Sequence, residues 1–171
     1  MTTPLFILSL LLGLLVAEMR VSRRHEDALR ARGAVEPPGD VYAAMAVTYP
    51  SAVIAMGLEG ALRAYWGRPV DPGFVLSGAM LMLASKALKY WAIGALGTRW
   101  TFRVLVLPGV PLVREGPYRY VAHPNYVAVV GELAGTAMMM QAWITGPIAL
   151  VAFGALLWIR VWIETRALRA T

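Results

Sequence analysis

The sequence predicts an all-α integral membrane protein with five transmembrane helices, the last two of which form a helical hairpin. Hydrophobic residues occupy 58% of the 171 positions and charged residues only 15%, whereas an average soluble domain carries about 25% charged residues. The mean hydropathy is +0.59. The apolar residues gather in five long segments and show no strand-like alternation. A globule this small cannot bury so much apolar side chain, so lipid is the expected solvent.

The first three expected spans lie in the first half of the chain. A transmembrane helix needs about 20 mainly apolar residues, and residues 4–19, 42–66 and 74–96 meet this need. Residues 1–17 lack the basic start and the cleavage site of a signal peptide, so we expect the first span to be retained. A separate short basic helix is predicted at residues 20–32, before a Gly- and Pro-containing connection.

The last two expected spans, residues 126–140 and 147–163, are close enough in sequence to form a hairpin. Residues 141–146 are predicted as its turn, and Pro147 is predicted at the first position of the last helix, which proline favours. The segment before the hairpin, residues 97–124, contains too many glycines and prolines to form one helix. A loop of this length in a small protein usually serves function.

The distribution of arginine predicts the orientation. Twelve arginines lie on one side of the expected bilayer and only Arg63 and Arg68 on the other, which predicts an outside N-terminus and a cytoplasmic C-terminus. The twelve are Arg20, Arg23, Arg24, Arg30, Arg32, Arg99, Arg103, Arg114, Arg119, Arg160, Arg166 and Arg169. Anionic lipid headgroups account for the net charge of +6, so no nucleic-acid partner is expected.

The composition also excludes several kinds of site. The chain has no cysteine, which excludes disulfides, thiolate nucleophiles and thiolate metal sites. Its two histidines, His25 and His123, are too few for a histidine metal cluster, so no metal is expected.

Ionisable residues inside expected spans are costly and usually face the bundle interior or a water-filled cavity. At 1.5 Å per residue, Lys89 lies about 10 Å and Glu132 about 9 Å from the same side of the expected bilayer. We therefore predict that Lys89, or Lys86 one turn away, pairs with Glu132. Such a pair serves either structure or substrate binding. Near the chain's end, Arg160 and Glu164 are four residues apart and share a helix face; an ordinary surface ion pair is the alternative there.

The most informative segment is residues 116–126, which read Gly-Pro-Tyr-Arg-Tyr-Val-Ala-His-Pro-Asn-Tyr. The two prolines hold this backbone away from helix, and Pro124 is suited to starting the next helix. The segment presents aromatic rings, an arginine and an imidazole at the membrane surface, although the tyrosines fit an aromatic belt equally well.

This segment, followed by a hairpin and the Arg160–Glu164 spacing, resembles the isoprenylcysteine carboxyl methyltransferase family and its phospholipid methyltransferase relatives. The resemblance covers about residues 100–168. Two positions depart from the family pattern: Ala122 stands where an arginine commonly precedes the His-Pro pair, and Thr165 stands where a second acidic residue often follows the glutamate.

A closer resemblance is to a bacterial branch of the family that O-methylates alkylpyrones or alkylresorcinols. The similar residues are 23–26, 32–36, Trp100, Arg103, 107–109 and the His-Pro-Asn-Tyr of 123–126 with the following Glu132.

The resemblance implies an S-adenosylmethionine-dependent O-methyltransferase, which releases S-adenosylhomocysteine, within one membrane domain of residues 1–171. Residues 1–97 would supply the first three spans and residues 98–171 the catalytic half. The implied acceptor is lipophilic, either a long-chain phenol or enol or a prenylcysteine-like carboxylate. The implied location is a bacterial-type cytoplasmic membrane, or an internal membrane, with the active site facing the cytoplasm.

The resemblance also implies roles for individual residues. Arg160 and Glu164 are the candidate catalytic residues, with Arg160 drawing the acceptor oxygen towards the methyl group. The candidate cofactor-binding residues are Tyr118, His123, Pro124, Asn125, Tyr126 and Glu164. The candidate substrate-binding residues are Lys89, Arg103 and Glu132.

Two alternatives remain open at this stage. One is a different enzyme of this type, a phospholipid N-methyltransferase. The other is a non-enzymatic membrane binding or transport subunit, although the paired repeats typical of transporters are not found in the sequence. The sequence leaves the oligomeric state open.

Overall fold

The computed structural model describes residues 2–169, without the side chains of residues 2 and 169. Within these residues the protein is all-helical, as predicted, and the only β-type pairing is an isolated antiparallel bridge between Val35 and Val106. Five α-helices and two short 3-10 helices follow in the order α1 (Thr2–Ala31), α2 (Tyr42–Tyr65), α3 (Pro72–Leu96), η1 (Gly97–Arg99), η2 (Gly116–Arg119), α4 (Pro124–Met140) and α5 (Thr145–Arg169).

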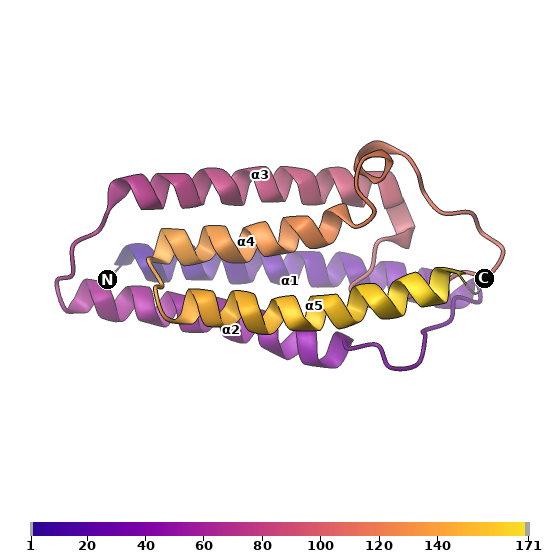
Figure 1. Cartoon of the computed structure of the whole chain (residues 1–171), viewed down its shortest axis with the longest axis horizontal. Coiled ribbons are helices and arrows are strands. Elements are labelled where there is room, and N and C mark those ends of the chain that lie inside the picture. The colour runs from indigo at the N-terminus through magenta and orange to yellow at the C-terminus, as the bar shows by residue number, and fades with distance from the viewer. Residues whose placement is uncertain (1, 170–171) are drawn as a thin grey trace.

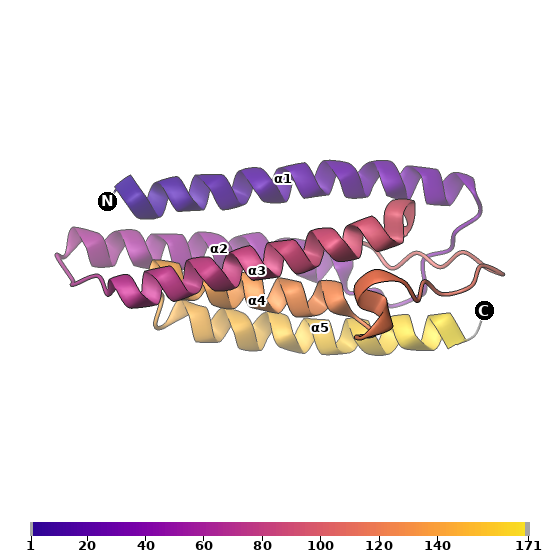
Figure 2. The same cartoon turned by 90° about the horizontal axis from the view of Figure 1, so that it is seen from above.

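The five α-helices lie roughly side by side along one long axis (Figures 1 and 2). Helices α1, α3 and α5 run in one direction and α2 and α4 in the other (Figure 1). The two long connections, residues 32–41 and 97–123, therefore lie at the same end as the last turns of α5. We call this end the loop end. The short connections after α2 and α4 lie at the opposite end.

Three helices are long and apolar enough to cross a membrane: Thr3–Ala31 of α1, Tyr42–Tyr65, and Thr145–Leu168 of α5. Helix α3 is long, but Lys86 and Lys89 lower its hydropathy, and α4 has only 17 residues. By length and composition, three of the described helices are thus candidate membrane spans, whereas the count of five spans and the orientation stay predictions. Of the arginines used to predict that orientation, Arg169 has its side chain outside the described residues.

Helix α1 differs from the prediction. A first span at residues 4–19 and a separate basic helix at 20–32 were expected, but the structure has one continuous helix of 30 residues. Hydropathy drops after Met19, yet the following residues are mostly strong helix formers without Gly or Pro, so the helix continues. At 1.5 Å per residue it is about 45 Å long, which exceeds the roughly 30 Å of a bilayer core.

Other helix boundaries differ by a few residues. Helices α3 and α4 begin two residues before the predicted starts, at Pro72 and Pro124, because proline suits the first turn of a helix. Helix α5 begins at Thr145, so Pro147 is its third residue and not its first, and it continues past residue 163 to Arg169.

Helices α3 and α4 pack closely through glycine. A Cβ atom at Gly78 would lie 2.8 Å from the carbonyl oxygen of Gly135, and a Cβ atom at Gly135 would lie 2.8 Å from the carbonyl oxygen of Gly78. Small residues at such a crossing let two backbones approach, a common device in membrane helix pairs. This contact fixes the position of α4, whose first residues belong to the site described below.

The apolar residues divide between a core and an outer surface. Met56, Leu133 and Phe153, from α2, α4 and α5, are at most 3% exposed and belong to the core cluster. On the outside, Val151 and Trp158 of α5 are 75% and 79% exposed. Large apolar side chains on the outside of a helix are expected where lipid covers it.

Candidate active site

Hydrogen bonds hold the two long connections at the loop end to each other and to α1. Val35 and Val106 exchange two such bonds of 2.9 Å, which join residues 32–41 to residues 97–123. The backbone N–H of Phe102 donates to the Ser22 hydroxyl of α1 at 2.7 Å. Trp100 is only 2% exposed. Residues 100–106 therefore form a fixed strap between α1 and the rest of the loop end.

A cavity of about 810 Å³ lies at the loop end, between this strap, η2 and the final turns of α5. Its volume falls in the range of small-molecule and cofactor sites. Its polar lining comes mainly from the predicted site residues Tyr118, His123, Asn125, Tyr126, Arg160 and Glu164, together with Arg99, Arg103 and Arg114. Its apolar lining includes Leu96, Leu105, Leu107, Val110, Leu112 and Val113.

Pro124 is the one predicted cofactor-binding residue that does not line the cavity. It is fully buried as the first residue of α4. Its fixed backbone angle starts the helix directly after His123, so it contributes by directing its neighbours.

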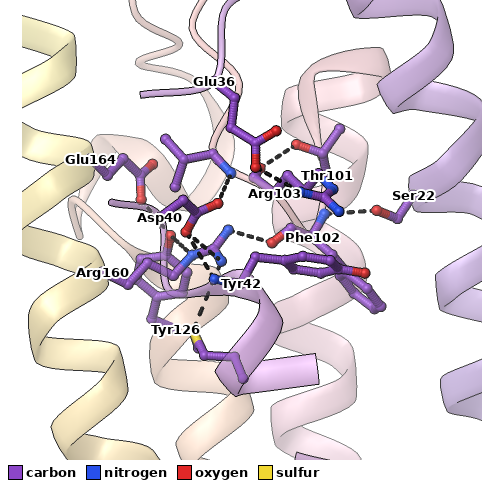
Figure 3. A network of polar contacts seen from close by, with 12 residues as sticks. Ser22, Glu36, Asp40, Tyr42, Thr101, Phe102, Arg103, Tyr126, Arg160 and Glu164 are labelled. Carbon is purple, nitrogen blue, oxygen red and sulfur yellow. Dashed lines mark hydrogen bonds and ion pairs between the residues drawn. The ribbon is translucent and has the colours of Figure 1, made fainter. Parts of the chain in front are cut away.

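The Tyr126 hydroxyl is the centre of the polar lining (Figure 3). It donates a short hydrogen bond to Oε2 of Glu164 and accepts one from Nε of Arg160 at 2.9 Å. The His123 ring stacks on the Tyr126 ring with centroids 5.2 Å apart, and its Nδ1 lies 3.8 Å from Glu164 Oε2. His123, Tyr126 and Glu164, which the resemblance implied as cofactor-binding residues, are thus brought together where the start of α4 meets the last helix.

Arg160 is held from three sides and is only 4% exposed. Besides Tyr126, its Nη2 donates to the backbone carbonyl of Phe102, and its Nη1 lies 3.6 Å from Oδ1 of Asp40 (Figure 3). All three guanidinium nitrogens therefore face protein partners. The predicted neighbour Glu164 is reached only through the Tyr126 hydroxyl.

Asp40 and Phe102 were missed by the sequence analysis. Every residue has a backbone carbonyl, so the sequence does not indicate that the carbonyl of Phe102 accepts from Arg160. Asp40 follows a Pro-Pro-Gly stretch in a connection without periodicity. The signal that was available is that Asp40 directly precedes an apolar span at the arginine-rich end of the chain.

Tyr118 is placed in the cavity by a tight turn at Gly116. Gly116 has φ +56°, which glycine adopts without strain, and a Cβ atom there would lie 2.9 Å from the Ala95 Cβ of α3. Burial, followed by the nearby Glu164 carboxylate, raises the pKa of the Tyr118 phenol. This phenol therefore stays protonated near neutral pH, where it is a hydrogen-bond donor and not a base.

Arg103 lines the same cavity but is already surrounded by acidic groups. Its Nη1 donates to Glu36 at 2.7 Å, its Nε lies 3.5 Å from Glu26, and its guanidinium lies 4.3 Å from the centre of the Tyr42 ring. Burial opposes ionisation of Glu36, but the hydrogen bonds from Arg103 and Arg30 outweigh it, and the pKa of Glu36 is lowered.

Lys89 and Glu132, the other predicted substrate-binding residues, do not line this cavity. They belong to a buried group within the helices, Glu18, Lys86, Lys89 and Glu132, which we call the charge cluster. Lys89 Nζ lies 2.7 Å from Glu132 and 3.0 Å from Glu18, and Lys86 Nζ lies 3.2 Å from Glu132 and 2.5 Å from Glu18. The predicted Lys–Glu pairing is confirmed, and it includes both lysines and a second carboxylate from α1.

The cavity lining determines which groups it can hold. Within the described residues, no group of three or more His, Asp or Glu side chains is arranged to hold a metal ion. The cavity instead offers one carboxylate, four arginines, stacked aromatic rings, an amide and a set of apolar side chains. The part of the lining around Glu164, His123 and Tyr126 suits a cationic group and a planar ring, whereas the arginines suit an acidic group.

Comparison with known proteins connects the cavity with a family. The sequence profile of the isoprenylcysteine carboxyl methyltransferase (ICMT) family matches residues 78–170. The uncharacterized protein YpbQ of Bacillus subtilis is 30% identical over 153 residues, which cover 90% of this chain and 89% of YpbQ. An uncharacterized protein of Haemophilus influenzae is 24% identical over 151 residues, or 88% of this chain and 86% of that protein. The family match includes η2, α4 and the last turns of α5 but not Asp40.

Proposed function

Because the chain belongs to the isoprenylcysteine carboxyl methyltransferase family, we propose that it is a membrane methyltransferase that uses S-adenosylmethionine to methylate an oxygen of a lipid-like acceptor. The observation that carries the proposal is the contact of His123 and Tyr126 with Glu164 on the wall of a large cavity. This contact brings the distinctive loop of the sequence and its final helix into one site.

The cavity residues fit the donor molecule. S-adenosylmethionine carries a cationic amino group, ribose hydroxyls and an adenine ring beside its sulfonium. Glu164 offers a carboxylate acceptor for the amino group or a hydroxyl, and the stacked rings of His123 and Tyr126 offer an aromatic surface. Tyr118 and Asn125 add a phenol and an amide to the lining.

Methyl transfer from an activated donor requires little from the protein beyond alignment of donor and acceptor. When bound, S-adenosylmethionine would supply an activated methyl group, and an ionised acceptor oxygen would attack the methyl carbon opposite the sulfur, so that the S–C bond breaks as the O–C bond forms and S-adenosylhomocysteine leaves with an uncharged thioether sulfur. The cavity residues hold the two reactants in line and exclude water. A partly desolvated site also strengthens each charged contact.

We assign Arg160 a positioning role in this reaction. The sequence favoured Arg160 as the group that draws the acceptor oxygen, but its three nitrogens already face Tyr126, Phe102 and Asp40. Its contact with the Tyr126 hydroxyl leaves the single proton of that hydroxyl directed at Glu164. In this proposal Glu164 contacts the donor, and Arg160 orients the Tyr126 hydroxyl.

The proposed acceptor is amphiphilic. The apolar lining of the cavity, which includes Leu105, Leu107 and Leu112, suits a hydrocarbon chain. Arg99 and Arg114 in the same lining favour an acidic head, such as a phenol, an enol or a carboxylate. This balance supports O-methylation over methylation of a cationic or neutral lipid amine.

The proposed site faces the cytoplasm. Eleven of the arginines that predict the cytoplasmic side lie in or beside the loop end, in the last turns of α1, the strap and loop, and the last turns of α5, whereas Arg63 and Arg68 lie at the other end of the molecule (Figure 1). An excess of arginine marks cytoplasmic segments. The charged donor would then enter from the cytosol, and the acceptor from the bilayer.

The test uses the whole protein purified in detergent. Arg160→Ala and Glu164→Gln are each expected to abolish methyl transfer from radiolabelled S-adenosylmethionine and to leave a folded helical protein. Glu59→Gln, which removes a carboxylate at the opposite end, is the matched control and is expected to keep activity. Near-wild-type transfer by both cavity variants would refute the site.

The same assay separates the alternatives. Offering an alkylresorcinol, an alkylpyrone, a prenylcysteine and phosphatidylethanolamine in parallel distinguishes O-methylation from phospholipid N-methylation. A wild-type protein that is folded but does not bind S-adenosylmethionine or S-adenosylhomocysteine in calorimetry would contradict the proposal and favour a non-enzymatic membrane subunit.

A further inference from the structure

Asp40 is a buried acidic residue with no part in the function proposed so far. It lies in the connection between α1 and α2, its side chain is 3% exposed, and it is outside residues 78–170 that match the family. Its Oδ1 accepts from the backbone N–H of Tyr42 at 3.2 Å, and its Oδ2 accepts from that of Val104 at 3.0 Å. These bonds join both long connections and fix the carboxylate in place (Figure 3).

This fixed carboxylate faces Arg160. The distance from Asp40 Oδ1 to Arg160 Nη1 is 3.6 Å, and both side chains are at most 5% exposed. Burying a charge without a partner is strongly unfavourable. Asp40 is therefore the acidic counter-charge that lets Arg160 remain buried.

Arg160 lies between two carboxylates that it contacts in different ways. It faces Asp40 directly, whereas it reaches Glu164 only through the Tyr126 hydroxyl. Arg160 and Glu164 are one helical turn apart, a spacing at which a direct ion pair forms readily. Without the opposing Asp40, the Arg160 guanidinium would form an ion pair with Glu164. The Glu164 carboxylate would then no longer be available to a group in the cavity.

From this arrangement we infer that Asp40 is a positioning residue for the methyl-donor site: it holds Arg160 away from Glu164 and so keeps the Glu164 carboxylate available to a cationic or hydroxyl group in the cavity. The inference rests on the proposed function and extends it to the half of the chain outside the family match. Asp40 acts through Arg160 and Tyr126 without touching the donor.

The first test is Asp40→Asn, which removes the charge and keeps an acceptor oxygen for one of the two backbone bonds. It is expected to weaken S-adenosylhomocysteine binding about tenfold or more, because a charged hydrogen bond to the ligand is lost. Asp40→Glu keeps the charge and is expected to stay within a few fold of wild type. Asp71→Asn is the matched control, since Asp71 caps α3 at the opposite end and lies far from the cavity.

The dependence on Glu164 separates this role from a purely structural one. In a Glu164→Gln background, Asp40→Asn should weaken S-adenosylhomocysteine binding no further, because the carboxylate it protects is gone. Wild-type affinity in a folded Asp40→Asn protein, or the same fold-loss in both backgrounds, would overturn the inference and leave the proposed function standing. An Asp40→Glu loss as large as that of Asp40→Asn would also overturn it.

A second measurement needs no ligand. If Arg160 turns to Glu164 when the Asp40 charge is absent, Glu164→Gln should lower the free energy of unfolding more in the Asp40→Asn protein than in wild type. Additive effects would contradict the inference. This unfolding cycle decides the arrangement of the three side chains even if wild-type protein fails to bind S-adenosylhomocysteine, an outcome that would refute the proposed function instead.

The double variant Asp40→Asn/Arg160→Gln serves if Asp40→Asn alone does not fold. It removes both charges and leaves no unpaired guanidinium, so it is expected to fold and, with no arginine to occupy Glu164, to bind S-adenosylhomocysteine, although without Arg160 it is not expected to transfer methyl groups. A double variant that is unfolded, or one without affinity where wild type binds, would overturn the inference.

Discussion

Removing one acidic member of the charge cluster is expected to destabilise the protein more than removing an acidic residue elsewhere. The chosen substitution is Glu132→Gln, because glutamine has nearly the same shape and still offers an oxygen to the Tyr49 hydroxyl, which donates to Glu132 Oε2 at 2.9 Å. The side chain of Glu132 is fully buried, and those of Lys86 and Lys89 are 13% and 4% exposed. The substitution therefore changes charge and little else.

The magnitude follows from counting charges. Two lysines and two glutamates balance in the wild-type cluster, whereas Glu132→Gln leaves both lysines to share Glu18 and gives a net charge of +1. Leaving a buried charge without its partner costs about 3–5 kcal/mol. The double variant Lys89→Met/Glu132→Gln is neutral again, so it should lose less stability than the sum of its two single variants, by up to about 3 kcal/mol.

The assay is equilibrium unfolding in detergent, with the helical signal as the readout, for wild type, both single variants and the double variant. Glu59→Gln is the control: Glu59 accepts from the backbone N–H groups of Ile144 and Thr145 at the start of α5, a capping role worth about 1 kcal/mol. The reasoning fails if Glu132→Gln costs no more than this control, or if the effects of Lys89→Met and Glu132→Gln simply add.

Three further predictions concern the site and its supports. His123→Ala is expected to weaken S-adenosylhomocysteine binding by removing the ring stacked on Tyr126; unchanged affinity in calorimetry would remove His123 from the site. Gly78→Leu is expected to lower the unfolding temperature because α3 and α4 touch there, whereas Gly94→Ala in the same helix, with open space around it, should have little effect; equal effects would argue against the close contact. The pKa of Glu36 is lowered in the folded protein, so its contribution to stability is present above its ordinary value of about 4.5 and is lost as the pH falls through the lowered value. Glu36→Gln should therefore flatten the acid limb of the stability profile, and an unaltered limb would speak against this ion pair.

The sequence predicted those parts of the fold that depend on local pattern. Apolar segments indicated all five α-helices, and matching depths indicated the Lys89–Glu132 pair. The unbroken α1 was not predicted, because hydropathy marks where lipid contact ends, whereas helix propensity determines where the helix ends. The place of Glu18 in the charge cluster was not predicted, because its pairing with Lys86 and Lys89 depends on where α1 lies relative to α3.

The candidate site was also predicted only in part. The family resemblance implied cofactor-binding residues both around the start of α4 and in the last helix, and the structure has Tyr126 in contact with Glu164. The sequence did not indicate that Arg160 is held by the Phe102 carbonyl and by Asp40. Both partners come from connections whose path is set by tertiary hydrogen bonds, and such bonds have no periodic pattern in the sequence.

The bridge between Val35 and Val106 has a practical consequence for exchanging parts between related proteins. It joins the connection after α1 to the loop that precedes α4, so the two segments share a backbone register. A chimera that takes residues 97–126 from one relative and residues 32–41 from another would combine two segments that do not pair in either parent protein. Grafting experiments aimed at acceptor choice should therefore transfer both segments together, as a single non-contiguous unit.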